Sequence, residues 1–140
     1  MIQRIQTLWL LFASALAFAT LKISFFSGNI IVENVKQFQH FTAMGNIFLM
    51  ILTVVVALGS LIAIFLFKNR KLQMRIASGM MVLSIVNLVL YYLQTKNFIP
   101  SDWSFDLTSL LAIAIPFFLF FATRGIYKDA KLLRSVDRLR

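Results

Sequence analysis

Four ionisable residues could bind a metal ion or move a proton, because each carries an imidazole or a carboxylate. They are Glu33, His40, Asp102 and Asp106, in two segments that lie far apart in the sequence. Histidine and carboxylate side chains are common metal ligands, but these intervals match no recognised ligand pattern. We therefore expect solvated loops here, and neither a metal site nor a cofactor.

Two further polar residues lie within strongly apolar segments, where a polar group needs a partner. Asn87 is near the middle of one segment, and an unpaired amide there would be costly in hydrocarbon. We expect Asn87 to bond a neighbouring helix, and contact with a substrate or an ion is the alternative. Lys22 lies one turn from the end of another apolar segment, so its ammonium is expected to reach the headgroups along its alkyl chain.

Catalysis is not expected from this chain. It contains no cysteine, which excludes disulfides, thiol nucleophiles and Cys-based metal sites. The single histidine lies outside the apolar segments, no nucleophile has a base beside it in sequence, and no Gly-rich phosphate loop is present. A membrane enzyme would lack the residues it needs.

The composition indicates a bilayer as the solvent. Hydrophobic residues make up 60% of the 140 positions and charged residues 14%, whereas an average soluble domain is about 45–50% apolar. The net charge of +9 is carried by short basic runs between apolar blocks. Nucleic-acid binding needs basic groups spread over a folded soluble face, so we do not expect it.

Four segments have the roughly 17–25 mainly apolar residues that a transmembrane helix needs. We predict an all-α membrane protein, a bundle of four transmembrane helices that forms one domain over residues 1–140. The predicted spans are residues 8–26, 47–67, 76–93 and 107–123, followed by a tail at 124–140. The connection at 27–45 has a mixed periodicity that identifies neither a helix nor a strand.

The first span has a second interpretation as a secretory signal peptide, because an AFA sequence at 17–19 follows a short apolar run. Two features favour a retained helix. Arg4 is the single positive residue before the apolar run, and apolar residues resume after Lys22.

The distribution of basic residues predicts the orientation, because Lys and Arg near the ends of spans resist translocation. Eleven of the fourteen lie before the first span, in the hairpin between the second and third spans, or in the tail. We expect this side to be cytoplasmic and to hold both termini, with the protein in a bacterial inner membrane. The opposite side carries Lys22, Lys36 and Lys96, balanced by Glu33, Asp102 and Asp106.

Small residues and a proline are candidates for contacts between helices. Gly59 and Ala63 are four residues apart in the second span, a spacing that lets two helix backbones approach closely. Chance in a segment rich in Leu and Ala is an equal alternative. Pro116 is expected to kink or loosen the fourth helix, because it removes a backbone hydrogen bond to residue 112.

The tail is predicted to form a short amphipathic helix on the cytoplasmic side, lying on anionic lipid or docked on protein. Asp129 and Asp137 intrude on its apolar face, where they could pair with Arg or Lys of the inner hairpin or of a partner; this favours docking. The candidate lipid or partner contacts are Arg70, Lys71 and Arg75 of the hairpin and Arg124, Lys128, Lys131, Arg134, Asp137 and Arg138 of the tail.

Three segments of the chain resemble a known family. MIQRIQTLWLL at the start, RKLQMRI in the hairpin and KDAKLLRSVDRLR at the finish are similar to a Bacteroidota family of small four-helix integral membrane proteins, catalogued as a domain of unknown function. The resemblance implies an inner-membrane protein and no established activity. The sequence pattern of that family emphasises charged residues of the cytoplasmic side, namely Arg4, Arg70, Lys71, Arg75, Arg134, Asp137 and Arg138.

These features favour a non-catalytic subunit or assembly partner of an inner-membrane complex. The alternative is a small transporter or channel, formed by one chain or by a homo-oligomer. Transport would be favoured by several polar side chains on one face of the spans, and Asn87 alone approaches that pattern. The expected partners are membrane lipids and either another membrane protein or further copies of the chain.

Overall fold

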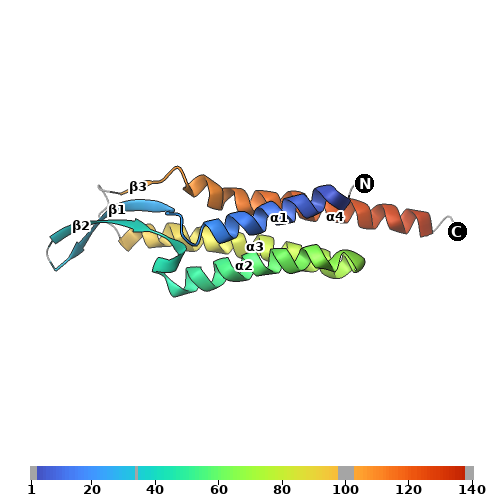
Figure 1. Cartoon of the computed structure of the whole chain (residues 1–140), viewed down its shortest axis with the longest axis horizontal. Coiled ribbons are helices and arrows are strands. Elements are labelled where there is room, and N and C mark those ends of the chain that lie inside the picture. Colours follow the sequence, from blue (N-terminus) through green and yellow to red (C-terminus); the bar gives the residue numbers. More distant parts are fainter. Residues whose placement is uncertain (1–2, 34, 98–102, 138–140) are drawn as a thin grey trace.

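A computed structural model of the chain describes residues 3–33, 35–97 and 103–137. Within these residues, four α-helices lie along one long axis and a small sheet lies at one end (Figure 1). We call this the sheet end, and we call the opposite end, where α2 turns into α3, the hairpin end. The helices are α1 (Gln3–Ala19), α2 (Ile47–Phe65), α3 (Arg70–Gln94) and α4 (Ser109–Asp137).

The helices pack as a closed bundle, because α1 and α3 each contact both α2 and α4. Small side chains in the core let the backbones approach closely, and aromatic side chains fill the α1–α4 contact, where Trp9 stacks on Phe118 at 5.5 Å between ring centroids. The buried core consists of Leu10, Ala13, Ala17, Val56, Ala57, Ala63, Ala77, Ile115, Leu119, Ala122 and Ile126.

The sheet end contains an antiparallel sheet of three strands, β1 (Phe26–Val32), β2 (Val35–Phe41) and β3 (Trp103–Phe105), in the order β2-β1-β3. The turn between β1 and β2 includes Glu33 in the left-handed region, at a φ of 51°. The prediction of an all-α protein is therefore wrong at this end. The central strand β1 pairs with β3, which lies far along the chain. The periodicity of a local segment therefore could not identify the sheet.

Aromatic side chains join the sheet to the helices. Phe25 stacks on Tyr91 of α3 with 4.5 Å between ring centroids, and Phe26 stacks on Phe41 of β2 at 4.8 Å. These rings form a second core with Ala43, Leu49 and Ala112. Phe25 and Phe26 are apolar because they fill this core rather than because they continue a transmembrane helix.

The predicted first span, residues 8–26, is therefore wrong at its C-terminal end. The helix α1 begins at Gln3 and ends at Ala19, and the hydroxyl of Thr20 then donates a hydrogen bond of 2.8 Å to the carbonyl of Ala17. Lys22 lies exposed in the following turn and not inside a helix. The ammonium of Lys22 therefore reaches solvent without the predicted extension of its alkyl chain along the first span.

The helices α3 and α4 are longer than the predicted spans, whereas α2 ends at Phe65, two residues before the predicted end. Asn69 caps α3 by accepting a hydrogen bond from the backbone N–H of Leu72 at 3.3 Å, so this helix starts well before residue 76. The helix α4 continues through Pro116 and joins the fourth predicted span to the tail as one helix up to Asp137. The short 3-10 turns are Ala43–Gly45, Leu66–Lys68 and Thr95–Asn97.

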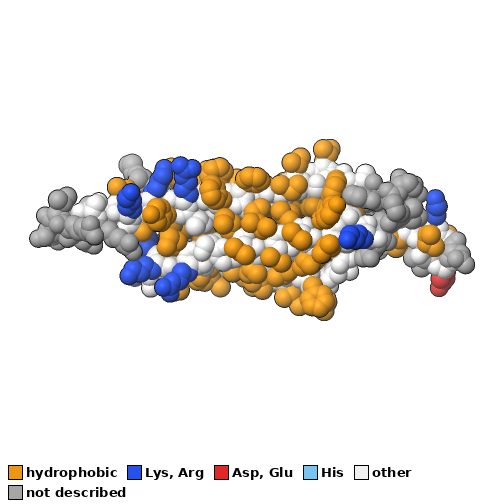
Figure 2. Space-filling view, turned by 180° about the vertical axis from the view of Figure 1, so that it is seen from behind, with side chains coloured by type: hydrophobic (Ala, Val, Ile, Leu, Met, Phe, Trp, Pro, Cys, Tyr) orange, Lys and Arg blue, Asp and Glu red, His pale blue; other side chains and the backbone are white. Residues whose placement is uncertain are grey.

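Three helical segments are long and apolar enough to cross a membrane: Ile47–Lys68, Arg70–Gln94 and Ser109–Leu133. The apolar part of α1, Ile5–Ala19, is shorter. Figure 2 shows a broad hydrophobic band across the middle of one face of the molecule, with Lys and Arg side chains gathered at the hairpin end. This arrangement is compatible with a multi-pass membrane protein.

Candidate functional site

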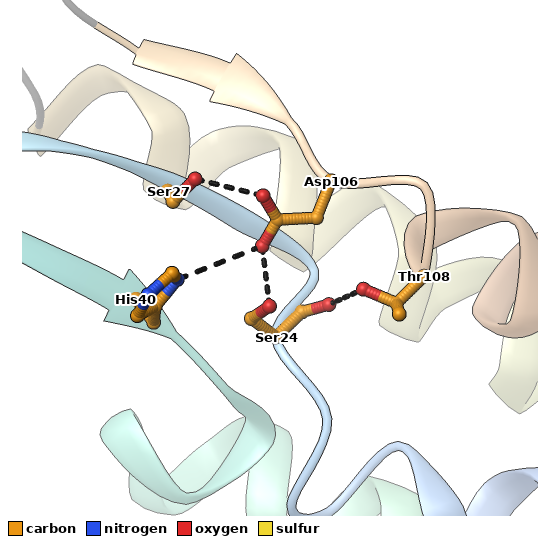
Figure 3. Close-up of polar contacts among 5 residues, drawn as sticks. All are labelled: Ser24, Ser27, His40, Asp106 and Thr108. Atoms are coloured by element: carbon orange, nitrogen blue, oxygen red, sulfur yellow. Dashed lines mark hydrogen bonds and ion pairs between the residues drawn. The ribbon is translucent and has the colours of Figure 1, made fainter.

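A carboxylate just before α4 gathers polar groups from several segments of the sheet end (Figure 3). The Oδ1 atom of Asp106 accepts a hydrogen bond from Ser27 at 2.7 Å, and its Oδ2 atom accepts one from Ser24. The Nδ1 atom of His40 lies 3.9 Å from the same Oδ2 atom. Thr108 adds a bond from its hydroxyl to the backbone carbonyl of Ser24. The cluster thereby ties β1 and β2 to the start of α4.

The surroundings of Asp106 favour its ionised form. Burial by itself would raise the pKa of this carboxyl, but hydrogen bonds from Ser24 and Ser27 and the nearby His40 imidazole outweigh that effect, so the pKa lies below its ordinary value. Both serine hydroxyls donate to the carboxylate and neither to the imidazole, so the geometry activates no nucleophile. The Asp106 cluster instead holds the sheet against the helix bundle.

The expectation of solvated loops is wrong for Asp106, whose side chain is 21% exposed and approaches His40; His40 lies in the strand β2 and not in a loop, with 61% of its side chain exposed. Glu33 stays exposed in the β1–β2 turn, and Asp102 lies outside the described residues. Within the described part of the chain, no three His, Asp or Glu residues come together in a way that could hold a metal ion.

A second polar cluster lies in the middle of the bundle. The Nδ2 atom of Asn87 in α3 donates a hydrogen bond of 3.0 Å to the hydroxyl of Thr53 in α2, and this hydroxyl donates to the carbonyl of Leu49 at 2.7 Å. Tyr91 also bonds the Thr53 side chain. The Oδ1 atom of Asn87 is buried without a protein partner among the described residues.

A small cavity adjoins this cluster. Its volume is about 10 Å³, and its polar lining comes from Thr20, Thr53, Ser84, Asn87 and Tyr91. A space of that size holds about one water molecule, which could satisfy the Oδ1 atom of Asn87.

The small residues of α2 are used inside the bundle. A Cβ atom added at Gly59 would lie 2.3 Å from the Sδ atom of Met80, so the glycine lets α3 approach α2 closely. Ala63 is fully buried, and its carbonyl accepts a hydrogen bond of 2.9 Å from the Nε2 atom of Gln73. Pro116 is half-buried within α4, which continues past it as a helix.

An ion pair joins α3 to α4 at the hairpin end. The Nη1 atom of Arg70 lies 2.9 Å from the Oδ2 atom of Asp129, and 14% of the Arg70 side chain and 8% of the Asp129 side chain are exposed. Asp129 thus pairs with an arginine of the same chain. Five other predicted contact residues are exposed: Lys71, Arg75, Arg124, Lys128 and Lys131. The side chains of Arg134 and Asp137, and the whole of Arg138, lie outside the described part of the chain.

The apolar face predicted for the tail is only partly covered. Ile126 is fully buried in the bundle, but Leu132 and Leu133 are 54% and 52% exposed. The reason is that α4 runs past the end of the bundle, as the red ribbon in Figure 1 shows.

Sequence reasoning missed two buried glutamines at the hairpin end, Gln6 and Gln73. A signal for Gln73 was present, because it shares a helical stripe with Ala77, Ser84 and Asn87. That stripe becomes visible only when α3 is extended back to Arg70, into the run that the sequence places in the hairpin.

The comparisons with known proteins give one match. A family model described as a domain of unknown function (DUF4293) matches residues 2–139. No curated protein matches the chain, and no solved structure matches it.

Proposed function

The chain belongs to the DUF4293 family, a domain of unknown function, and from this premise we propose that it is a non-catalytic subunit or assembly partner of a bacterial inner-membrane complex. The observation that carries the proposal is the end of α4. This helix exposes Leu132 and Leu133 beside Lys128 and Lys131. An exposed surface that is both apolar and basic suits contact with another molecule.

Membrane insertion provides the setting for this role. Three segments have the length and composition to cross a bilayer, and we infer that α1 crosses as a fourth span because it packs between α2 and α4. Its 17 residues extend about 25 Å at 1.5 Å per residue. A hydrocarbon core of roughly 30 Å accommodates such a deficit by local thinning.

The orientation follows from the charges. Basic side chains gather at the hairpin end (Figure 2). In the described chain, three basic residues belong to segments toward the sheet end, Lys22, Lys36 and Lys96. Because basic residues resist translocation, the hairpin end is the cytoplasmic side and the sheet faces the opposite compartment. Both termini are then cytoplasmic, and α4 extends from the membrane toward cytoplasmic partners.

Transport is the second candidate, and the bundle interior gives it little support. The cavity beside Asn87 measures about 10 Å³ and is lined by no Lys, Arg, Asp or Glu. A passage for ions or polar solutes needs a wider polar lining. A homo-oligomeric channel would have to line its pore with outward faces of the helices, where large hydrophobic side chains such as Val55, Leu58 and Ile62 are exposed.

Site-specific photo-crosslinking tests the partner role. A photoreactive amino acid at Leu133 is expected to give a discrete crosslinked protein in native membranes, because this side chain is exposed beyond the bundle. The matched control is Leu58 of α2, an exposed leucine in the middle of a span, where we expect no discrete protein product.

Each outcome of this experiment has a defined meaning. A product of twice the mass of the chain would favour the homo-oligomer over a different partner. If Leu133 gave no protein product, the subunit role would be rejected and the end of α4 would be a lipid anchor.

A further inference from the structure

An open groove lies at the hairpin end between α1 and the turn from α2 to α3. Its volume is about 620 Å³, within the usual range of about 300–1,000 Å³ for sites that bind small molecules. Five apolar side chains and four polar ones line it: Leu8, Leu11, Ile64, Phe65, Phe67, Gln6, Thr7, Arg70 and Gln73.

Two buried amide atoms at this groove have no hydrogen-bond partner among the described residues. They are the Nε2 atom of Gln6, a donor, and the Oε1 atom of Gln73, an acceptor. Each side chain belongs to a residue that is only 3% exposed. The orientation of the Gln73 amide is fixed because its Nε2 atom already donates to the carbonyl of Ala63.

These two atoms require complementary partners. A hydroxyl group can donate to the oxygen of Gln73 and accept from the nitrogen of Gln6, whereas an ammonium group can only donate and an ionised phosphate oxygen can only accept. Unpaired buried amides are rare in folded proteins, so a hydroxyl-bearing molecule in the groove would remove two unfavourable features at once. Because both atoms are buried, a ligand in the groove reaches them only if the two side chains shift.

A positive charge lies beside the glutamines. Arg70 uses its Nη1 atom to bind Asp129, while its guanidinium offers further donors in the planar arrangement that suits a phosphate. The Asp129 carboxylate balances this one charge, and the exposed Lys68 and Lys71 on the same turn keep the region basic. An anionic group is therefore attracted to this end of the groove.

The polar and apolar parts of the groove follow the axis of the bundle. Gln6 precedes Leu8 by two residues and Leu11 by five residues of α1, so the apolar part begins about 3 Å deeper along the helix axis and continues to about 7.5 Å. Leu8, Leu11 and Phe65 are about half exposed or more, and they leave apolar surface open to a chain of methylene groups. This order, polar at the end and apolar toward the middle, is that of a lipid in a bilayer leaflet.

We propose that the groove binds one phospholipid with an anionic, hydroxyl-bearing headgroup of the phosphatidylglycerol type. The phosphate lies beside Arg70, a headgroup hydroxyl bridges Gln6 and Gln73, and an acyl chain follows Leu8 and Leu11. The site depends on the proposed membrane location, because a bilayer is the source of the ligand. It gives the protein a means to distinguish one lipid from another.

Native mass spectrometry of the full chain in mild detergent tests the site. Purified protein is mixed with phosphatidylglycerol, with phosphatidic acid, which lacks the headgroup hydroxyls, or with phosphatidylcholine, which lacks the net charge. We expect phosphatidylglycerol to be retained about ten-fold more than phosphatidylcholine, with phosphatidic acid between them. Equal retention of all three lipids would overturn the proposal.

Matched variants separate the groove from general attraction to anionic lipid. Gln6→Leu removes the unpaired donor at similar size, and we expect it to reduce phosphatidylglycerol retention about ten-fold without lowering the unfolding temperature of lipid-free protein. The control Lys71→Gln removes an exposed charge on the same turn outside the groove lining, and we expect retention to change less than about two-fold. If the two variants had equal effects, surface charge and not this site would explain the binding.

Two further results are informative in their own right. Resistance of the wild-type chain to extraction from membranes by alkaline carbonate tests the membrane location separately from lipid selectivity. A chain that resists extraction but retains the three lipids equally would keep the proposed location and lose the lipid site. If Gln6→Leu and Gln73→Leu each abolished the preference for phosphatidylglycerol over the other two lipids, the result would support a hydroxyl that bridges the two glutamines.

Discussion

At Asp106, two serine hydroxyls and an imidazole converge on one carboxylate that stands between the sheet and α4. In the unfolded chain these groups are far apart, because Ser24 precedes Asp106 by 82 positions. The interactions that depress the pKa of this carboxyl therefore exist only in the folded state. Their contribution to stability must depend on pH.

Acidification is expected to remove the contribution of Asp106. The folded-state pKa lies below its ordinary value of 3.8, so the unfolded chain takes up the proton first as the pH falls. The stabilisation is complete above 3.8 and is lost as the pH falls through the folded-state pKa. Unfolding temperatures of wild type and Asp106→Asn in detergent should therefore differ most near neutral pH and converge in acid.

Two control variants make this pH test specific. Glu33→Gln removes an exposed carboxylate of the β1–β2 turn, and its difference from wild type should stay small at every pH. His40→Gln removes the other titratable group of the cluster and shows how much of the pH dependence passes through the imidazole. A difference between wild type and Asp106→Asn that did not change with pH would contradict the assigned role.

Thr53 in α2 is the hydrogen-bond partner of two side chains of α3, Asn87 and Tyr91. Thr53→Val keeps the shape but leaves both buried groups without this partner. We expect the free energy of unfolding to fall by about 1–3 kcal/mol. The control is Thr123→Val in α4, because the Thr123 hydroxyl bonds the carbonyl of Leu119 in its own helix. Equal effects of the two substitutions, measured by thermal unfolding, would show that the inter-helix bond contributes little.

Some of these residue contacts could be predicted from sequence and others could not. An amide in the middle of an apolar segment must find a partner, so the inward position of Asn87 followed from its chemistry. Asp129 needs a partner for the same reason, because it is a charge on an apolar helix face, and it pairs with Arg70. The contact between His40 and Asp106 depends on a sheet that joins distant segments, and no local pattern indicates it.

At the scale of elements, two glycines show how differently one residue type is used in neighbouring helices. A Cβ atom at Gly59 of α2 would meet the side chain of Met80, whereas a Cβ atom at Gly79 of α3 would meet nothing within 4 Å. The first glycine permits a close helix contact and the second leaves a helix interior less rigid than it could be.

The two alanine substitutions are therefore expected to act in opposite directions. Gly79→Ala should raise the free energy of unfolding by about 0.5–1 kcal/mol, because alanine loses less conformational entropy in a helix. Gly59→Ala should lower it by about 1–2 kcal/mol, because Met80 must move within a packed interface. Thermal unfolding measures both, and shortening the neighbour in Gly59→Ala/Met80→Ala should relieve the steric part. A stabilising Gly59→Ala would contradict the close α2–α3 contact.

Helices were predictable here and the sheet was not, for a physical reason. A run of about twenty apolar residues identifies a helix such as α2 by length alone. The same criterion extended the first span to Phe26, because it counts apolar residues without knowing whether they face lipid or pack on another element. Phe25 and Phe26 pack on Tyr91 and Phe41, contacts that exist only once the sheet has formed.

At the scale of the whole molecule, a basic hairpin end and a small sheet end lie on opposite sides of a hydrophobic band (Figure 2). If the band lies in a bilayer, each end faces a different compartment. The projecting α4 and the proposed lipid groove then share the basic side, while the Asp106 cluster lies on the other. The sidedness of the molecule is therefore what separates its candidate functions in space.

Labelling of single cysteines tests both this sidedness and the crossing of α1. The chain has no cysteine, and Lys36 in β2 and Lys71 in α3 are both exposed, so a difference in labelling at these positions reports the compartment and not burial. We expect an impermeant maleimide added to intact bacteria, with the outer membrane made permeable, to reach Lys36→Cys and to miss Lys71→Cys. A cysteine on a short linker before Met1 decides whether α1 crosses: protection until lysis requires four spans, whereas immediate labelling leaves three. If Lys71→Cys alone were labelled in intact cells, the proposed orientation would be wrong. The basic end would then lie on the side that basic residues resist reaching.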